Sequence, residues 1–406
     1  MEKFINKSYQ INAIIDTPSI QCPPEFLNES AEKSARKFHE SIEEYNVTPL
    51  VRLHGLSKKL GLSGVYVKDE SYRFGLNAFK ALGGSYAVAR IICKKLGINI
   101  NGVSFDYFKQ DKVRDKIKDI VFVTATDGNH GRGVAWASSK IGCRSVVYLP
   151  KGSAKSRVEA IKKAGAETHV TDFNYDDSVK LAAKKAEENG WYLVQDTAFE
   201  MYEEVPNWIS QGYTTMAGEA LEQLEAFGIH KPTHVFLQAG VGSMAGAVLG
   251  YYANKFNGNP PTTVIVEPKE AACIYKSKFA GDGKPHTVKG DLKTIMAGLA
   301  CGSPNCVTWQ ILDKFASGYI TCPDYVSANG MRILANPCEN DRKIISGESG
   351  AVGVGLLSLI MEKDELSELR KLLGLNKDSV VLLFSTEGNT DPENYNKIVF
   401  NLKEDD

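Results

Sequence analysis

Residues 77–85 read Asn77-Ala78-Phe79-Lys80-Ala81-Leu82-Gly83-Gly84-Ser85 and join a predicted strand to a predicted helix. The strand is the apolar run 65–67, and the helix carries apolar residues at helical spacing until Gly97. We expect Asn77 to be the N-cap, which puts Lys80 in the first turn. The helix dipole disfavours a cation there by about 0.3–1 kcal/mol. Lys80 is therefore either a surface lysine whose amine reaches water or a desolvated amine that forms a Schiff base.

Length and composition predict a globular protein of two domains. The 406 residues are 43% hydrophobic and 24% charged, which are ordinary values for a folded chain. The formal net charge of −1 gives no support for nucleic-acid binding, and no apolar run is long enough to cross a bilayer. The N-terminus lacks a secretory signal pattern. We expect a cytoplasmic protein with neither a nucleic-acid nor a membrane partner.

The eight cysteines do not predict a metal site, because no two of them form a CxxC pair. In a reducing cytosol most of them should be buried thiols. Cys273, Cys301 and Cys306 lie in a stretch rich in polar and glycine residues. A disulfide within that group therefore stays open as an alternative.

From residue 119 onward, predicted strands and helices alternate along the chain, which indicates right-handed βαβ units and parallel sheets. The strands are expected at 120–123, 145–149, 167–170, 191–194, 235–238, 263–266 and 380–384. Helices are expected at 154–164, 176–189, 207–227, 306–316, 324–336 and 349–361. Earlier in the chain we expect an irregular leader within residues 1–45, with a polar helix over 29–44, and a loop over 99–118. The predicted fold is α/β, with a large domain of residues 1–80 and 213–406 and a smaller domain of residues 81–212.

Four loops follow predicted strands or open predicted helices, and each combines glycine with polar residues. In open α/β sheets ligands bind at the carboxyl ends of the strands. Backbone amides at a helix N-terminus suit a phosphate or a carboxylate, and a hydroxyl after the last strand can hydrogen-bond a neutral ring nitrogen. The loops are Thr124–Gly131, Gln238–Gly246, Gly347–Gly353 and Ser385–Asn389.

The second loop also imitates a dinucleotide-binding fingerprint. Glu267 ends the next strand at about the separation expected for a ribose-binding acid, although the second and third glycines are one residue too far apart. A dinucleotide-binding oxidoreductase is therefore a remote alternative. It leaves Lys80, the first loop and the fourth loop without a role.

The lysine and the four loops, taken together, resemble the fold type II pyridoxal-phosphate enzymes, the group of threonine dehydratase and the tryptophan synthase β chain. Within that group, the runs 68–70, 75–84 and 126–136 are similar to the diaminopropionate ammonia-lyase family. The resemblance extends from Thr48 to Asn389. It implies two open, twisted parallel-sheet domains with pyridoxal 5′-phosphate in the cleft between them, an amino-acid substrate and a homodimer.

The resemblance also implies a role for individual residues. Lys80 would hold the cofactor covalently and act as a base, Asp127 would be the base on the opposite face of the substrate, and Asp196 would donate a proton to the leaving amine. Thr126, Asp127, Gly128 and His130 would form the substrate site. The remaining cofactor contacts would come from Asn129 at the phenolic oxygen, from Thr386 at the ring nitrogen with Ser385 as its backup, and, at the phosphate, from the backbone amides of Gly240, Val241, Gly242, Ser243 and Met244.

Asp127 distinguishes between two reactions that enzymes of this group catalyse. Threonine dehydratases have Ser-Ala-Gly-Asn-His where this chain has Thr126-Asp127-Gly128-Asn129-His130. A carboxylate would crowd the carboxylate of a hydroxyamino acid, whereas beside a substrate with two amines it can act as a base. The resemblance therefore implies α,β-elimination of both enantiomers of 2,3-diaminopropionate to pyruvate and two ammonia. A serine or threonine dehydratase is the alternative.

Overall fold

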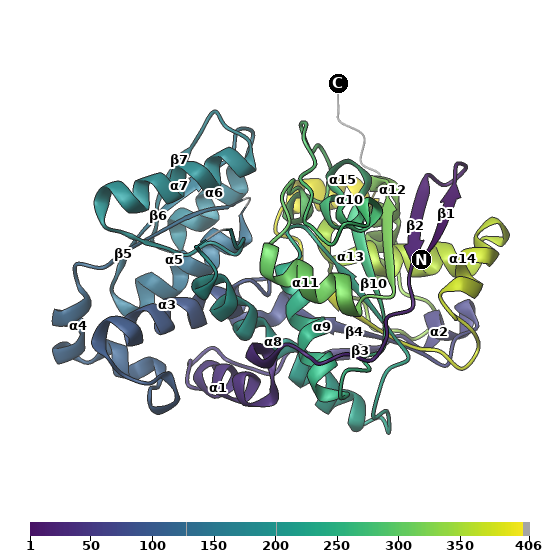
Figure 1. Ribbon diagram of the computed structural model, residues 1–406, viewed down its shortest axis with the longest axis horizontal. Helices are drawn as coiled ribbons and strands as arrows, with labels where there is room; N and C mark the ends of the chain where they lie inside the picture. The colour runs from purple at the N-terminus through teal and green to yellow at the C-terminus, as the bar shows by residue number, and fades with distance from the viewer. Residues whose placement is uncertain (127, 200, 401–406) are drawn as a thin grey trace.

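The computed structural model describes residues 1–126, 128–199 and 201–400. Figure 1 shows two lobes, each built on a sheet. The strands of the larger, eight-stranded sheet are, in spatial order, β1 Glu2–Asn6, β2 Ile11–Ile15, β11 Gly318–Cys322, β10 Thr262–Pro268, β9 His234–Gln238, β12 Val380–Ser385, β4 Gly64–Asp69 and β3 Leu50–Arg52. Those of the smaller sheet are β7 Glu167–Val170, β6 Arg144–Leu149, β5 Val121–Ala125 and β8 Tyr192–Leu193.

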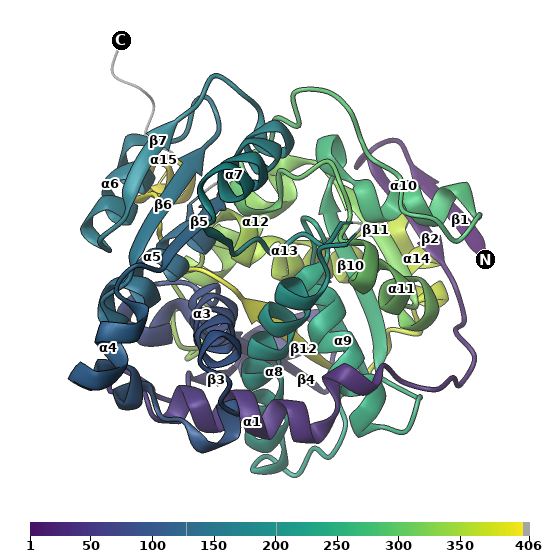
Figure 2. The ribbon, with the colours of Figure 1, turned by 60° about the vertical axis from the view of Figure 1, so that its left-hand side comes forward.

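The helices surround the two sheets, as the turned view in Figure 2 shows. Their bounds are α1 Glu29–Glu40, α2 His54–Leu60, α3 Ala81–Leu96, α4 Asp111–Ile117, α5 Asn129–Ile141, α6 Lys155–Lys163, α7 Tyr175–Asn189, α8 Glu204–Glu225, α9 Ser243–Lys255, α10 Cys273–Ala280, α11 Cys306–Phe315, α12 Asp324–Ala335, α13 Glu348–Glu362, α14 Ser367–Leu372 and α15 Pro392–Phe400. None of the helices within the described residues is long and apolar enough to span a bilayer.

Both faces of the large sheet are covered, which explains why its central strands are apolar runs rather than alternating patterns. In β9, Val235 and Leu237 pack into the core that contains α8 and α9. Phe236, between them, packs into the opposite core with α12 and α13. Successive side chains of a strand point to opposite faces, so one apolar run serves both cores. The predicted α/β class with two parallel-sheet units is confirmed, and all four strands of the small sheet are parallel.

The large sheet carries antiparallel strands at both ends that the sequence did not predict. The predicted irregular leader is wrong, because β1 and β2 form an antiparallel hairpin and β2 pairs with β11. At the other end β3 pairs antiparallel with β4. The predicted loop over 99–118 is also wrong, because it contains the 3₁₀ helices Ile100–Gly102 and Phe105–Lys109 and the helix α4.

Helix α3 starts later than predicted. Asn77 is not its N-cap: it has a φ of +56°, in the left-handed region, and the helix begins at Ala81 with Lys80 as the preceding residue. The lysine therefore stands at the helix start rather than inside its first turn. Helices α3 and α5 also approach closely. A Cβ on Gly133 of α5 would lie 2.8 Å from Cα of Ala81, so glycine is required for this contact.

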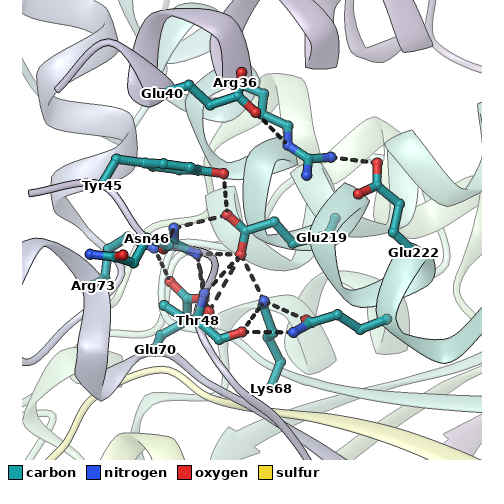
Figure 3. A network of polar contacts seen from close by, with 12 residues as sticks. Arg36, Glu40, Tyr45, Asn46, Thr48, Lys68, Glu70, Arg73, Glu219 and Glu222 are labelled. Carbon is teal, nitrogen blue, oxygen red and sulfur yellow. Dashed lines mark hydrogen bonds and ion pairs between the residues drawn. The ribbon is translucent and has the colours of Figure 1, made fainter. Parts of the chain in front are cut away.

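A cluster of buried charges fixes the segment that leads to Lys80 (Figure 3). We call Lys68, Glu70, Arg73 and Glu219 the buried ion-pair cluster; their side chains have an exposed fraction of 0%. Lys68 is the penultimate residue of β4, and Glu70 and Arg73 belong to the 3₁₀ helix Glu70–Gly75, whereas Glu219 comes from α8. The cluster thus ties two distant parts of the chain together.

The charged groups of the cluster are joined by short contacts, and their formal charges cancel. Oε2 of Glu219 lies 2.7 Å from Nζ of Lys68 and 2.8 Å from Nη2 of Arg73. Arg73 also contacts both carboxylate oxygens of Glu70, at 2.8 and 2.9 Å. Burial raises the pKa of Glu219, but the charges of Arg73 and Lys68 outweigh it and hold this pKa below its usual range. Glu219 is therefore ionised. The cluster contains two acidic and two basic side chains, so its formal charges cancel.

Candidate active site

A cavity lies where segments of both sheets meet. Lys80 at the start of α3, Asn129 at the start of α5 and Asp196 after β8 line it. From the large sheet and its loops come Gln238 to Ala245, residues 298, 299 and 301, Ser349, Thr386 and Glu387. The loops after β9 and β12 and the loop at the start of α5 thus face one another, as the rule for open α/β sheets predicts.

Backbone contacts to the end of β12 set the position of Lys80. The amide of Phe79 donates to the carbonyl of Thr386 at 3.0 Å, and Ala78 forms an isolated bridge with Glu387. Nζ of Lys80 donates to Oδ2 of Asp196 at 2.5 Å. The Lys80 side chain is only 17% exposed. Of the two interpretations of the sequence, this burial favours the desolvated amine over a lysine that reaches water.

Asp196 is a buried anion on the opposite wall. Burial raises the pKa of its carboxyl group, but the charges of Lys80 and His130 outweigh burial and hold this pKa well below its usual range. The Tyr175 hydroxyl donates to Oδ1 at 3.4 Å. Beside the charged amine of Lys80, Asp196 is therefore ionised and can bind an ammonium group. Its predicted role as proton donor to the leaving amine stays a prediction.

The glycine loop between β9 and α9, which we call the cradle, has the backbone geometry that suits an anion. The first backbone hydrogen bond of α9 runs from Gly246 to the carbonyl of Gly242, so the amides that precede Gly246 have no partner within the helix. Gly242 has a φ of +91°, which side chains rarely tolerate. A Cβ on Gly240 would lie 3.2 Å from Sγ of Cys301. Both glycines therefore keep the cradle open, at the positive end of the helix dipole.

Asn129 faces the cavity with its amide held by Glu387. Nδ2 of Asn129 donates to Oε2 of Glu387 at 2.6 Å, and the backbone amide of Ser349 donates to Oε1 at 3.1 Å. This hydrogen bond places the nitrogen of the Asn129 amide toward Glu387. The second hydrogen on that nitrogen stays available to a ligand.

The two hydroxyls after the last strand have different surroundings. Thr386 lines the cavity, and its Oγ1 accepts a hydrogen bond from Nε2 of Gln238 at 2.9 Å. Ser385 is 1% exposed and its hydroxyl is hydrogen-bonded to Ser346 at 2.8 Å. Ser385 does not line the cavity, so its predicted role as backup stays a prediction.

None of the predicted substrate residues of the first loop that the structure describes lines the cavity. Asp127 lies outside the described residues. Oγ1 of Thr126 accepts from the amides of Gly128 and Gly131 at 2.9 and 3.0 Å, which caps α5. Nε2 of His130 is hydrogen-bonded to the carbonyl of Val194 at 2.8 Å. The described side chains of this loop therefore hold the start of α5 in place and do not line the cavity. Substrate contacts of Thr126, Gly128 and His130 stay predictions.

Glu267 does not fit the dinucleotide alternative. Its carboxylate accepts from the backbone amides of Ile274 and Tyr275 at 2.8 and 2.7 Å, and its exposed fraction is 0%. Burial raises its pKa to about 8. A group that caps α10 in this way cannot reach a ribose, so that interpretation of Glu267 is wrong. Cys273 and Cys301, both buried beside the cradle, form no disulfide within the part of the chain that the structure describes.

Comparison with known proteins gives one consistent result. The family model described as "Pyridoxal-phosphate dependent enzyme" matches residues 43–385. The diaminopropionate ammonia-lyase of Salmonella typhimurium is 51% identical over 92% of this chain and 93% of its own length. The chain belongs to the diaminopropionate ammonia-lyase family.

Solved structures of the family agree with the fold. The Escherichia coli enzyme in complex with an aminoacrylate-PLP azomethine reaction intermediate is 47% identical, with a TM-score of 0.89 over 97% of both chains. The same enzyme in complex with D-serine is also 47% identical, with a TM-score of 0.90 over 96% of this chain and 97% of that one. The predicted membership of this family, its fold and its cofactor are confirmed.

The cavity fits the cofactor of the family chemically. The cradle before α9 offers amides to a phosphate, Lys80 offers an amine to an aldehyde, and Asn129 offers an N–H to a phenolic oxygen. Thr386, which lines the cavity, would supply a hydroxyl to the ring nitrogen. Each assignment matches a polar group that lines the cavity with a complementary group of pyridoxal phosphate.

Several cavity residues were missed by sequence reasoning. Glu387 belongs to the fourth loop and could have been found there, since a carboxylate next to a hydroxyl is a signal. Gln238 ends a predicted strand but resembles any polar strand end. Tyr175 and residues 298, 299 and 301 were not assigned to the site from the sequence, and only the folded chain brings them to the cavity.

Proposed function

We propose that this protein converts 2,3-diaminopropionate to pyruvate and two ammonia, with pyridoxal 5′-phosphate as cofactor and with both enantiomers as substrates. One observation carries the proposal: the amine of Lys80 lies 2.5 Å from the buried carboxylate of Asp196, beside the anion cradle of α9. An amine, a carboxylate and a phosphate site in one cavity are what elimination of a diamine requires. Membership of the family supports the substrate.

The residues divide the work of elimination among them. Bound pyridoxal phosphate withdraws electrons from Cα of an amino acid attached to it. When the amine of Lys80 is no longer bonded to the cofactor, it can take the proton from Cα of the substrate. Asp196, held ionised, attracts the β-ammonium group, which already carries the proton it needs to leave as ammonia. The carboxylate therefore positions the leaving group.

Asp127 is proposed to be the base on the opposite face of Cα. Two bases on two faces let both enantiomers lose the Cα proton. Replacement of Asp127 by asparagine should slow one enantiomer by a factor of about 10²–10⁴, the usual contribution of a general base, and change the other much less. Pyruvate formation from D- and L-diaminopropionate, assayed separately, measures this. Equal losses for both enantiomers, or unchanged rates, would contradict the assignment.

The function is tested by counting products. Purified protein should absorb visible light because of the bound cofactor, and this absorbance should change when diaminopropionate is added. Each pyruvate should appear with two ammonia. Serine in a parallel tube is the control, because a hydroxyamino acid can release only one. A protein that turns over serine or threonine faster than diaminopropionate would instead be a dehydratase.

We also propose a cytoplasmic homodimer, as the family resemblance implies. Light scattering coupled to gel filtration should give twice the chain mass of 44.5 kDa. A monomer mass at micromolar concentration would exclude the dimer.

A further inference from the structure

We infer that Gln238 sets the direction of the hydrogen bond between Thr386 and the pyridine nitrogen of the cofactor, so that Thr386 donates and the nitrogen stays unprotonated. The inference rests on the proposed function, since it needs the cofactor ring beside Thr386. Gln238 is thus a positioning residue that acts through the hydroxyl.

Gln238 has only one possible orientation of its amide. It is the last residue of β9, it is 2% exposed, and its Nε2 donates to the backbone carbonyl of Phe384 at 2.9 Å. A carbonyl can only accept a hydrogen bond. The nitrogen of the amide, and not its oxygen, must therefore face β12.

The same nitrogen determines what Thr386 can do. Its other hydrogen goes to Oγ1 of Thr386, also at 2.9 Å. A hydroxyl has one hydrogen and two lone pairs, so an N–H from Gln238 occupies one lone pair and leaves the hydroxyl hydrogen for another partner. Thr386 is 3% exposed and lines the cavity, so that partner lies on the cavity side.

A hydroxyl that points its hydrogen into the cavity selects the charge state of the ring. An unprotonated pyridine nitrogen offers a lone pair and accepts this hydrogen. A pyridinium N–H would bring a second donor to the same oxygen and leave the hydroxyl hydrogen without an acceptor in a buried place. The arrangement therefore disfavours protonation of the ring nitrogen.

Reversal of the amide tests this direction. In Gln238→Glu, the O–H of the buried carboxylic acid takes the place of Nε2 and must give its single hydrogen to the carbonyl of Phe384. That oxygen has no second hydrogen for Thr386, so it accepts the hydroxyl hydrogen instead. The lone pairs of Thr386 then face the ring. Nitrogen-15 NMR of holoenzyme loaded with ring-labelled pyridoxal phosphate should move upfield, from the position of an unprotonated pyridine toward that of a pyridinium. In the unmodified holoenzyme the resonance should be independent of pH.

Three further variants separate this role from a structural one. Gln238→Met removes the donor without reversing it, so the resonance should become dependent on pH even if Gln238→Glu does not fold. In a Thr386→Val background, Gln238→Glu should no longer move the resonance, because Gln238 acts only through the hydroxyl. Gln223→Met removes a part-buried amide on α8 that contacts Lys68 and Thr48, and it should leave the resonance unchanged.

Two results would overturn the inference. One is an unchanged resonance in both folded, cofactor-loaded variants of Gln238. The other is a shift that persists without the Thr386 hydroxyl, which would mean a direct effect of the new acid on the ring. Failure of the proposed function looks different, because a protein that turns over serine faster than diaminopropionate would still bind the cofactor and give the resonance.

Discussion

Replacement of Lys80 by alanine should abolish the release of ammonia from diaminopropionate, with a fall in kcat on the order of 10⁴-fold. The variant loses both the amine that holds the cofactor covalently and the base beside Cα. Lys80 is the one lysine among the described residues that line the cavity, so no neighbour there can replace it. The visible absorbance of the covalently held cofactor should disappear with the activity. Steady-state pyruvate assays and absorbance spectra measure the two effects.

Two control variants sharpen this experiment. Lys80→Arg keeps a positive charge beside Asp196 but cannot bond covalently to an aldehyde, so it should be as inactive as the alanine variant. Lys94→Ala removes an exposed lysine of the same helix, whose ion pair with Glu204 lies at the surface, and should leave activity unchanged. Retained absorbance in Lys80→Ala would remove the central assignment.

Glu219→Ala should produce the largest loss of stability. The variant leaves Lys68 and Arg73 buried with only Glu70 to balance them. Removal of one partner from a buried ion pair costs about 3–5 kcal/mol of unfolding free energy, because a charge then stays in the interior without compensation. Urea denaturation followed by circular dichroism measures the loss. Cofactor affinity should fall as well, since the cluster fixes the segment that leads to Lys80.

Glu222 offers a matched comparison one turn further along α8. Its carboxylate pairs with Arg36, but its side chain is 60% exposed. An exposed ion pair contributes about 0–1 kcal/mol, so Glu222→Ala should shift the urea midpoint little. Equal losses in the two variants would mean that burial of the cluster does not determine its energy.

The regular part of the fold could be predicted because its pattern is local. Strand β7 has the predicted bounds 167–170, and the helices after residue 300 that were predicted begin within one residue of the expected position. The hairpin of β1 and β2 could not be predicted in the same way. Its strands are five residues long and partly exposed, and β11, the partner of β2 in the sheet, lies about 300 positions later. Such strands are stabilised by pairing rather than by their own sequence.

The site was predictable where one loop contains the signal. The glycine cradle, Lys80, Asn129 and Thr386 were all found from residues adjacent in sequence, and the structure brings them to one cavity. The roles of Gln238 and of the buried ion-pair cluster depend on partners far away in the chain, so no single segment predicts these roles. Asn77 was assigned as a helix cap because its residue type fits, but backbone pairing with the last strand delays the helix start.

The bridge between Ala78 and Glu387 has a consequence for the order in which the molecule is made. Asn77 and Asn389, whose side chains are hydrogen-bonded beside it, are 312 residues apart. During synthesis Lys80 leaves the ribosome long before β12, the strand whose end positions it, has been made. Strand β4 cannot pair with β12 until then either. The small sheet, contained within residues 121–193, can pair as soon as it emerges. A nascent chain therefore contains the Lys80 amine before the cofactor site has formed. We expect the cofactor to bind only when the protein is nearly complete.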